Sequence, residues 1–271
     1  MKKFAVIGNP ILHSLSPAMH NWIFEKLKIN AEYIKINIEP NQIPVVLNKI
    51  RTKELNGINV TLPYKQNIIE YLDDINIRAS KMGTVNCIFE LDSKLIGFNT
   101  DWYGFSKAIE NNSIHFKNEK IILIGAGGTT KSIIFALKQL GVKKIFLFNR
   151  TLKNAKLLED DIVMSYQIDC LNKFIDKYTI IINTTPLGMN EKDQLFDLNL
   201  LTKNHIIMDV IYTPLETSFL RQGNKIGATT INGLDMFMYQ GLASLDLWFG
   251  EAISKSVNFE QLKTYLKTKL C

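Results

Sequence analysis

A short apolar run passes directly into a glycine-rich turn in the stretch Ile121–Ser132, IILIGAGGTTKS. The four apolar residues at its start predict a buried strand, and apolar residues recur at helical spacing over 131–140. A strand, a glycine turn and a helix together form a cradle for a phosphate group, because the helix N-terminus presents free N–H groups to an anion. Thr130 stands where the third glycine of G-x-G-x-x-G would be, so the turn alone indicates only a nearby phosphate.

Short apolar runs alternate with helical patterns on both sides of this turn, which predicts an α/β fold. Before the turn we expect strands at 4–7, 33–38 and 57–61, a hairpin of 85–91 with 94–98, and helices over 17–28, 43–50 and 63–72. From the turn onward we expect strands at 121–124, 145–148, 180–182, 206–210 and 228–231 in a doubly wound parallel sheet. Further helices are expected over 102–110, 235–250 and 259–269, and the polar link 111–120 is the expected domain boundary.

The bulk composition is that of a globular chain long enough for two domains: 271 residues, of which 46% are hydrophobic and 21% are charged. The net charge is +6 and the pI is about 9.0, but no cluster of Lys and Arg is interleaved with aromatic residues. The charge pattern therefore favours a solvated basic surface and a polyanionic small-molecule ligand over a nucleic acid. No apolar run approaches the roughly 18 residues of a membrane span, and the N-terminal run is too short for a signal peptide.

Neither a disulfide framework nor a metal site is expected. The three cysteines, Cys87, Cys170 and Cys271, contain no C-x-x-C pair, and the four histidines lack metal-ligand spacing. Cysteines of this kind are typical of a reducing compartment, so we expect a cytoplasmic protein.

The strand after the glycine turn is expected to end in Asn149-Arg150-Thr151. A dinucleotide fold that binds NAD usually has Asp or Glu at this place for the ribose hydroxyls. Arg150 can instead pair with a 2′-phosphate, and Thr151 can donate a hydrogen bond to it. The spacing from the glycines predicts NADP as the cofactor, and the alternative is that Arg150 is a surface arginine of a βα loop.

Lys65 and Asp101 are the candidate proton-transfer residues. Lys65 lies two residues after Pro63, in the first turn of the helix expected there, where the helix dipole and burial both disfavour the ammonium form. Asp101 lies at the junction between the two strand–helix series and could orient Lys65 from a cleft. The alternatives are an exposed solubilising lysine and an aspartate that caps the helix beginning at Trp102.

Two serines precede the first expected helix. Ser16 has the position of an N-cap and Pro17 that of the first helical residue, whereas Ser14 is freer to contact a ligand. The helix N-terminus at Pro17 could also receive a substrate carboxylate.

A series of sequence blocks resembles the shikimate dehydrogenase family. The first half of the chain carries GNP at 8–10, HSLSP at 13–17, HN at 20–21, NVTLPYK at 59–65, GTVN at 83–86 and GFNTD at 97–101. The second half carries GAGG at 125–128, NRT at 149–151, NTTPLGM at 183–189, DVIY at 209–212 and NGLDM with YQG at 232–241. These blocks follow the family's order across nearly the whole chain.

The resemblance implies the NADP-linked reversible reduction of 3-dehydroshikimate to shikimate, in the route to chorismate and the aromatic amino acids. It implies two α/β domains with a cleft between them: a substrate-binding domain of residues 1–101 plus 237–271, and a Rossmann-type NADP-binding domain of residues 102–236. It also implies that Lys65 and Asp101 form the catalytic pair. The partner is then a small molecule, with neither nucleic acid nor membrane involved, and the protein is a monomer or a homodimer.

The resemblance also implies the residues of both binding sites. Those around the substrate would be Ser14, Ser16, Thr61, Lys65, Asn86, Asp101, Tyr212 and Gln240. Those around the cofactor would be Gly125, Ala126, Gly127, Gly128, Thr129, Asn149, Arg150, Thr151, Lys153, Thr185, Val210 and Gly233.

Three positions depart from the family pattern. Ile77 stands where many members have an acidic residue, and Asn154 stands where many have a second arginine for the 2′-phosphate, so that Lys153 or Lys156 is its candidate substitute. Thr130 replaces a small residue at the start of the helix.

Two alternative functions can be weighed on single residues. An NAD-dependent quinate/shikimate dehydrogenase would be favoured by an acidic residue at 150 or 151, where Arg and Thr stand. A non-catalytic dinucleotide-sensing module would be favoured by the loss of Lys65 or Asp101, and both are present.

Overall fold

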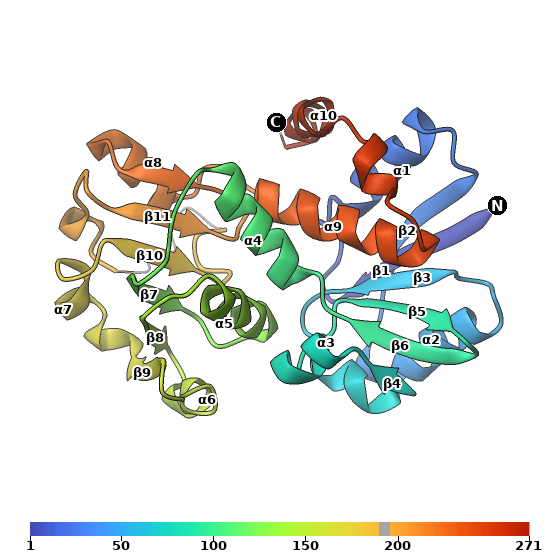
Figure 1. Ribbon diagram of the computed structural model, residues 1–271, viewed down its shortest axis with the longest axis horizontal. Helices are drawn as coiled ribbons and strands as arrows, with labels where there is room; N and C mark the ends of the chain where they lie inside the picture. The colour runs from blue at the N-terminus through green and yellow to red at the C-terminus, as the bar shows by residue number, and fades with distance from the viewer. Residues whose placement is uncertain (190–195, 271) are drawn as a thin grey trace. The chain divides into compact units, whose positions relative to one another are not determined.

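The computed structural model describes residues 1–189 and 196–270, so Cys271 lies outside the described residues. The chain forms two compact units. Unit 1 combines Met1–Gly104 with the C-terminal part from Met238, and unit 2 is Phe105–Phe237. Each unit is built on one six-stranded sheet with helices around it (Figure 1).

The sheet of unit 2 is parallel throughout, as the sequence predicts. Its strands are β7 (Lys120–Ile124), β8 (Lys144–Asn149), β9 (Val163–Gln167), β10 (Ile180–Asn183), β11 (Ile206–Asp209) and β12 (Thr229–Ile231). They lie in the order β12-β11-β10-β7-β8-β9, the doubly wound arrangement, with the strand order reversing between β7 and β10. Parallel strands covered on both faces need continuous apolar runs, which explains why β7, β8 and β10 are evident in the sequence and the more polar β9 is not.

Short helices connect these strands. They are α4 (Asp101–Asn111), α5 (Gly128–Gln139), α6 (Leu152–Lys156), α7 (Asn172–Ile175) and α8 (Ser218–Ile226). The buried side chains of α5 include Ile133, Ile134 and Leu137, which are the positions of its apolar spacing. Gly128 already belongs to this helix, so the helix begins inside the glycine turn.

The sheet of unit 1 is mixed. Its strands are β1 (Lys2–Gly8), β2 (Ala31–Asn37), β3 (Gly57–Val60), β4 (Asp74–Ile75), β5 (Cys87–Leu91) and β6 (Lys94–Phe98), in the order β2-β1-β3-β5-β6-β4. The predicted hairpin is confirmed as the antiparallel pair of β5 and β6. Its two-residue turn has positive φ at both Asp92 and Ser93, 49° and 62°, which matches the twist of the paired strands.

The helices of unit 1 bury apolar side chains against this sheet. They are α1 (Ser16–Lys26), α2 (Ile43–Arg51), α3 (Ile77–Met82), α9 (Leu234–Phe249) and α10 (Phe259–Thr268), of which α9 begins in unit 2. Val46, Leu47 and Ile50 of α2 join the core cluster of the sheet. On α9, Trp248 stacks on Phe4 with ring centroids 4.7 Å apart, so the end of the chain completes the unit that the beginning started.

The helix predicted from Pro63 is wrong. Residues 62–66 form turns, and a 3₁₀ helix, η2 (Asn67–Tyr71), follows them. The side chains of Tyr64 and Ile68 are both buried, which explains why apolar residues recur here at helical spacing. The Oη of Tyr64 donates a hydrogen bond of 2.5 Å to the carbonyl oxygen of Ile38. Lys65 therefore does not lie in the first turn of an α-helix.

The N-cap predicted at Ser16 is also wrong. Helix α1 begins at Ser16 itself, with Leu15 in the cap position and no side-chain cap bond. The Ser16 hydroxyl instead accepts a hydrogen bond of 3.2 Å from the hydroxyl of Ser14.

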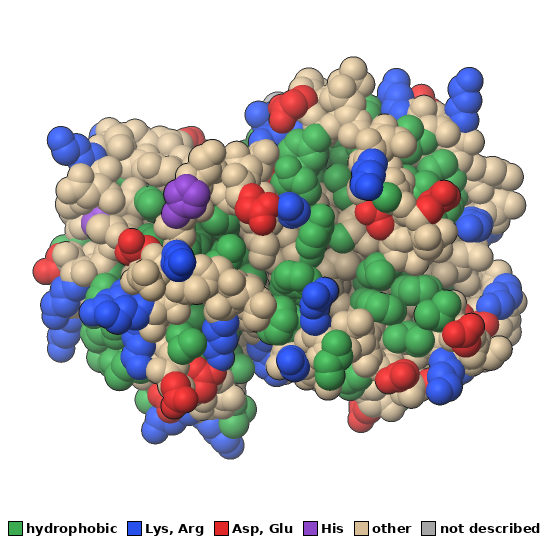
Figure 2. Space-filling view, in the orientation of Figure 1, with side chains coloured by type: hydrophobic (Ala, Val, Ile, Leu, Met, Phe, Trp, Pro, Cys, Tyr) green, Lys and Arg blue, Asp and Glu red, His purple; other side chains and the backbone are tan. Residues whose placement is uncertain are grey.

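On the face shown in Figure 2, Lys and Arg side chains lie scattered among acidic ones in both units. Within residues 1–189 and 196–270, no helix has both the length and the apolarity that a membrane crossing requires.

Gly233 of unit 2 lies directly against the backbone of Val210. A Cβ at this position would lie 2.0 Å from the carbonyl oxygen of Val210 and 2.5 Å from its carbonyl carbon, so the backbone itself would have to move. We predict that Gly233→Ala lowers the free energy of unfolding by at least about 2 kcal/mol, as overpacking does, measured by urea denaturation followed by circular dichroism. Gly127→Ser is the control, because nothing lies within 4 Å of a Cβ there and serine suits an N-cap. Equal stability of the two variants would contradict the prediction.

Candidate active site

A buried ion pair joins Lys65 and Asp101 in unit 1. Lys65 Nζ donates a hydrogen bond of 2.6 Å to Asp101 Oδ2, and the two residues are only 8% and 4% exposed. The amide of Asn86 donates a bond of 2.7 Å to the other carboxylate oxygen, Oδ1. Lysine and aspartate are rarely buried unless they are paired, so the two sequence alternatives, a solubilising lysine and a capping aspartate, do not describe these side chains.

The backbone around the pair is fixed by neighbouring strands and turns. The carbonyl oxygen of Lys65 accepts a hydrogen bond of 2.8 Å from the N–H of Val85, just before β5. Asp101 is the first residue of α4, and its N–H donates a bond of 3.0 Å to Asn99 Oδ1. Asn99 thus provides the local side-chain acceptor for this helix start, which leaves the Asp101 carboxylate for Lys65 and Asn86.

Other predicted substrate residues of unit 1 lie in three places. Gln240 of α9 accepts a bond of 3.3 Å at Oε1 from Asn86, which places it in the same cluster as the ion pair. Ser14 and Ser16 form a hydroxyl pair at the start of α1. Thr61 follows β3, and its N–H is bonded to the carbonyl of Ile7.

Tyr212, which the sequence also assigns to the substrate, belongs to unit 2. Its ring lies 4.5 Å from that of Phe237, centroid to centroid.

The glycine turn of unit 2 has the form needed to approach a phosphate. Gly125 has φ of +116°, and a Cβ there would lie 2.4 Å from Thr184 Oγ1, so only glycine suits this position. Gly127 has no heavy atom within 4 Å of a Cβ position, so the space beside it at the N-terminus of α5 is open. This is the arrangement that binds anions through backbone N–H groups.

Thr130, which breaks the glycine fingerprint, links this turn to the neighbouring strand. Its buried hydroxyl accepts a hydrogen bond of 3.1 Å from the N–H of Gly127 and lies 2.7 Å from Thr184 Oγ1, just after β10. Thr184 in turn donates to the carbonyl of Ile124 at the end of β7. Thr130, through Thr184, therefore links the ends of β7 and β10, the two strands between which the strand order reverses.

The cationic group predicted to recognise a 2′-phosphate lies at the same edge of the sheet. Strand β8 is parallel to β7, so its terminal Asn149 lies at the edge from which the glycine turn leaves. The amide of Asn149 donates a bond of 2.8 Å to the carbonyl of Thr151, and the side chains of Arg150, Thr151 and Lys153 are exposed. Exposed cations at this edge are accessible to an anionic ligand. Asn154 and Lys156, on the same short helix, are exposed as well.

Two polar residues not predicted for the site hold the loops after β10 and β11. Asn183 donates from Nδ2 to Asp209 Oδ1 at 3.1 Å, and its own Oδ1 accepts the N–H and the hydroxyl of Thr185. Asp209 also accepts the N–H of Ile211 at 3.1 Å and the hydroxyl of Thr217 at 2.9 Å. Burial raises the pKa of Asp209 to about 6, against the lowering effect of these donors. The only sequence signal for the pair is a polar residue at the end of each buried strand.

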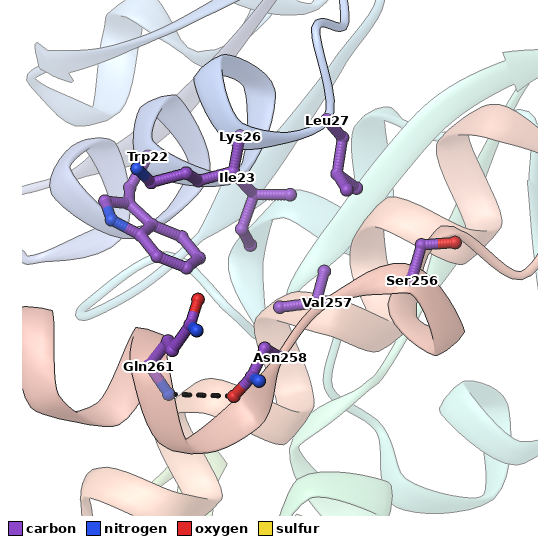
Figure 3. A pocket seen from close by; sticks show the side chains of 8 residues that line it. All are labelled: Trp22, Ile23, Lys26, Leu27, Ser256, Val257, Asn258 and Gln261. Atoms are coloured by element: carbon purple, nitrogen blue, oxygen red, sulfur yellow. Dashed lines mark hydrogen bonds between the residues drawn. The ribbon is translucent and has the colours of Figure 1, made fainter.

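A cavity of about 230 Å³ lies between α1 and α10 of unit 1 (Figure 3). Its lining is Trp22, Ile23, Lys26, Leu27, Ser256, Val257, Asn258 and Gln261, none of which is a predicted site residue. The Asn258 side chain is already bonded to the N–H of Gln261 as the cap of α10. This cavity lacks a carboxylate to accompany Lys26, so it offers no acid–base pair.

No group of three or more His, Cys, Asp or Glu side chains suited to a metal ion occurs in the described part of the chain.

The comparisons with known proteins agree on one family. Residues 6–88 match the family model of the shikimate dehydrogenase substrate binding domain, and residues 107–193 match that of shikimate / quinate 5-dehydrogenase. The NADP(+)-dependent shikimate dehydrogenase of Lysinibacillus sphaericus is 38% identical, covering 98% of this chain and 99% of its own.

Solved structures agree with the sequence relatives. Shikimate dehydrogenase of Aquifex aeolicus has a TM-score of 0.90 at 32% identity, with 98% of this chain and 97% of that chain covered. Shikimate 5-dehydrogenase of Thermus thermophilus, solved in complex with NADP(H) and shikimate, has a TM-score of 0.83 at 29% identity, with 95% and 100% covered.

The raised pKa of Asp209 predicts a pH-dependent stability difference. Because the folded pKa of about 6 lies above the ordinary aspartate value of 3.8, the native state binds the proton more tightly, and the carboxyl group's contribution to stability falls as pH rises from about 4 to about 6. We expect the unfolding free energy of Asp209→Asn, relative to the unsubstituted protein, to increase by roughly 2–3 kcal/mol between pH 4 and 7. Urea denaturation across this range measures the difference, and a difference independent of pH would disprove the assignment.

Proposed function

The chain belongs to the shikimate dehydrogenase family, and we infer that it catalyses the NADP-linked, reversible reduction of 3-dehydroshikimate to shikimate, a step of the shikimate pathway. The observation that carries the mechanism is the buried ion pair of Lys65 and Asp101, which is bonded to Asn86. A carbonyl reduction needs a proton donor that is positioned before the reaction, and this pair provides one.

We propose that Lys65 is the proton donor and Asp101 orients it. Bound NADPH supplies a hydride to the ketone carbon, and the C=O π electrons move onto oxygen. The ammonium group of Lys65 donates a proton to this oxygen, which completes the hydroxyl group and leaves a neutral amine to be reprotonated from solvent. One of its three N–H donors is held by Asp101 at 2.6 Å, which restricts the direction of the others. Proton donation of this kind contributes roughly 10²–10⁴ in rate.

We propose that the substrate is also bound by the polar residues that the family resemblance implies, namely Ser14, Ser16, Thr61, Asn86, Tyr212 and Gln240. Asn86 and Gln240 are supported by their bonds within the cluster of the ion pair, and Ser14 and Ser16 by their shared hydrogen bond. On this proposal the substrate-binding domain is residues 1–101 plus 237–271, which largely coincides with unit 1.

We propose that residues 102–236, which largely coincide with unit 2, bind NADP. Its cofactor residues would be Gly125, Ala126, Gly127, Gly128, Thr129, Asn149, Arg150, Thr151, Lys153, Thr185, Val210 and Gly233. The open space beside Gly127 supports a pyrophosphate site at the start of α5. The exposed side chains of Arg150 and Thr151 support a 2′-phosphate site.

We further propose a cytoplasmic location and a monomeric or homodimeric state. The thiols of Cys87 and Cys170 are free, which suits a reducing compartment.

Lys65→Ala tests the proton donor. We expect kcat for shikimate oxidation to fall by at least ~10² with little change in the Michaelis constant, because the lost interaction acts mainly in the transition state. Absorbance at 340 nm measures the rate with shikimate and NADP⁺, and circular dichroism verifies folding. Lys49→Ala removes an exposed, ion-paired lysine of the same unit and is the control. A Lys65→Ala variant with near-normal kcat would remove Lys65 from the mechanism.

Arg150→Ala tests the cofactor assignment. We expect the Michaelis constant for NADPH to rise much more than that for NADH, because only NADPH carries the 2′-phosphate. Arg221→Ala, an exposed arginine of the same unit, is the control and should leave both constants unchanged. Equal effects of Arg150→Ala on the two cofactors would contradict a 2′-phosphate contact. Rates on quinate with NAD⁺ in the same assay distinguish the alternative substrate and cofactor.

A further inference from the structure

Ser244 is a fully buried hydroxyl residue of α9, one helical turn after Gln240. Its Oγ donates to the carbonyl oxygen of Gln240 at 3.0 Å and accepts a bond of 2.9 Å from Asn59 Nδ2. It also lies 3.2 Å from Thr100 Oγ1. A serine hydroxyl has one hydrogen, and the carbonyl of Gln240 can only accept it. In the contact with Thr100 the Ser244 oxygen is therefore an acceptor, and the Thr100 hydroxyl can donate either to Ser244 at 3.2 Å or to Asn86 Oδ1, also at 3.2 Å.

The direction of this bond determines how Asn86 is held. With its hydrogen on Ser244, Thr100 Oγ1 can accept from Asn86 Nδ2 at 3.0 Å, while the N–H of Thr100 donates to Asn86 Oδ1 at 2.7 Å. The amide of Asn86 is thus bonded at both ends, and its second N–H hydrogen is shared between Asp101 Oδ1 at 2.7 Å and Gln240 Oε1 at 3.3 Å. Ser244 therefore acts on the ion pair through two intermediate residues, without contacting Lys65 or Asp101 in any described bond.

Asn59 makes a second connection to the same place. Its Nδ2 donates both to Ser244 and to the carbonyl of Asn86, at 3.0 Å, and its Oδ1 accepts the hydroxyl of Tyr33 at 2.8 Å. Because the carbonyl of Asn86 can only accept, the orientation of the Asn59 amide is determined. Loss of the Ser244 oxygen would leave one buried N–H of Asn59 without its acceptor.

Two titratable side chains next to these bonds, those of His20 and Cys87, are uncharged. Burial lowers the pKa of His20, which stacks on Tyr33 at 4.3 Å, to about 3. Burial also raises the pKa of the Cys87 thiol, a neighbour of Ser244, to about 12. Near neutral pH these side chains are neutral, so hydrogen-bond geometry and not a further charge connects Ser244 to the ion pair.

We propose that Ser244 is a positioning residue for the reaction: its hydroxyl fixes the orientation of Thr100 and Asn59, and through Asn86 it fixes the Asp101 carboxylate that aims Lys65. This role rests on the proposed function of the Lys65–Asp101 pair. Without the Ser244 oxygen, the Thr100 hydroxyl turns to Asn86 Oδ1, its other acceptor at 3.2 Å, and Asn86 is no longer held in one orientation. The ion pair remains but samples more geometries, which slows a step that depends on alignment.

Ser244→Ala should lower kcat for shikimate oxidation about tenfold, while the Michaelis constant for NADP⁺ stays within twofold, because the glycine turn belongs to the other unit. Thr100→Val keeps the shape of the side chain and removes its hydroxyl. In the Thr100→Val background, Ser244→Ala should lower kcat less than twofold, because the connection is already cut. Ser254→Ala, whose hydroxyl bonds Asp246 at the end of α9, is the control and should keep kcat.

A kcat of Ser244→Ala that equals that of the unsubstituted enzyme would overturn the proposal. The proposal would also be overturned if the loss of kcat in the double variant equalled the product of the losses in Ser244→Ala and Thr100→Val, because the two substitutions would then act through independent losses of packing. The melting temperature of each variant shows whether its loss of kcat comes from unfolding alone. A loss of that kind would also count against the positioning role of Ser244. An unsubstituted protein that does not turn over shikimate would overturn the proposed function, and the role of Ser244 with it.

Discussion

The ion pair of Lys65 and Asp101 determines much of what surrounds it in unit 1. Removing two charges from water costs several kcal/mol per ion, and their attraction offsets this cost only when the remaining hydrogen-bonding capacity is also satisfied. Asn86 satisfies one carboxylate oxygen and Lys65 the other. The neutral amides and hydroxyls behind Asn86 hold these partners in place, so the requirements of the buried ion pair extend into the core between the sheet and α9.

In unit 2 the corresponding constraint is the parallel sheet. Because its strands run in one direction, the glycine turn after β7 and the loops after β8, β10 and β11 all leave from one edge. Bonds between neighbouring loops give this edge a defined shape: Thr130 to Thr184, and Asn183 to Asp209. Rigid loops of this kind allow backbone N–H groups to face an anion without reorganising.

The sequence predicted the elements whose conformation depends on neighbouring residues. It failed at segments whose conformation depends on contacts between residues far apart in the chain. The buried strand at Ile121–Ile124 and the turn at Asp92-Ser93 are determined by neighbouring residues alone. The segment after Pro63 has helical spacing, but Tyr64 is bonded to Ile38, twenty-six positions away, and the chain there forms turns. The pairing of Lys65 with Asp101 was predicted, whereas the linking roles of Thr130 and Asn183 depend on strand neighbours that no local pattern reveals.

Two buried aspartates show why residue type alone could not assign these roles. Asp101 has a lysine ammonium 2.6 Å away, whereas the donors that the described residues provide to Asp209, from Asn183, Ile211 and Thr217, are neutral. Burial raises the pKa of Asp209 to about 6, so this group keeps its proton to a higher pH than an exposed aspartate, and its bonds fix the loops. A carboxylate that faces a cation can instead hold a proton donor in one direction. The fold provides one aspartate with a cation and the other with dipoles, so the same residue type lies in two different electrostatic environments.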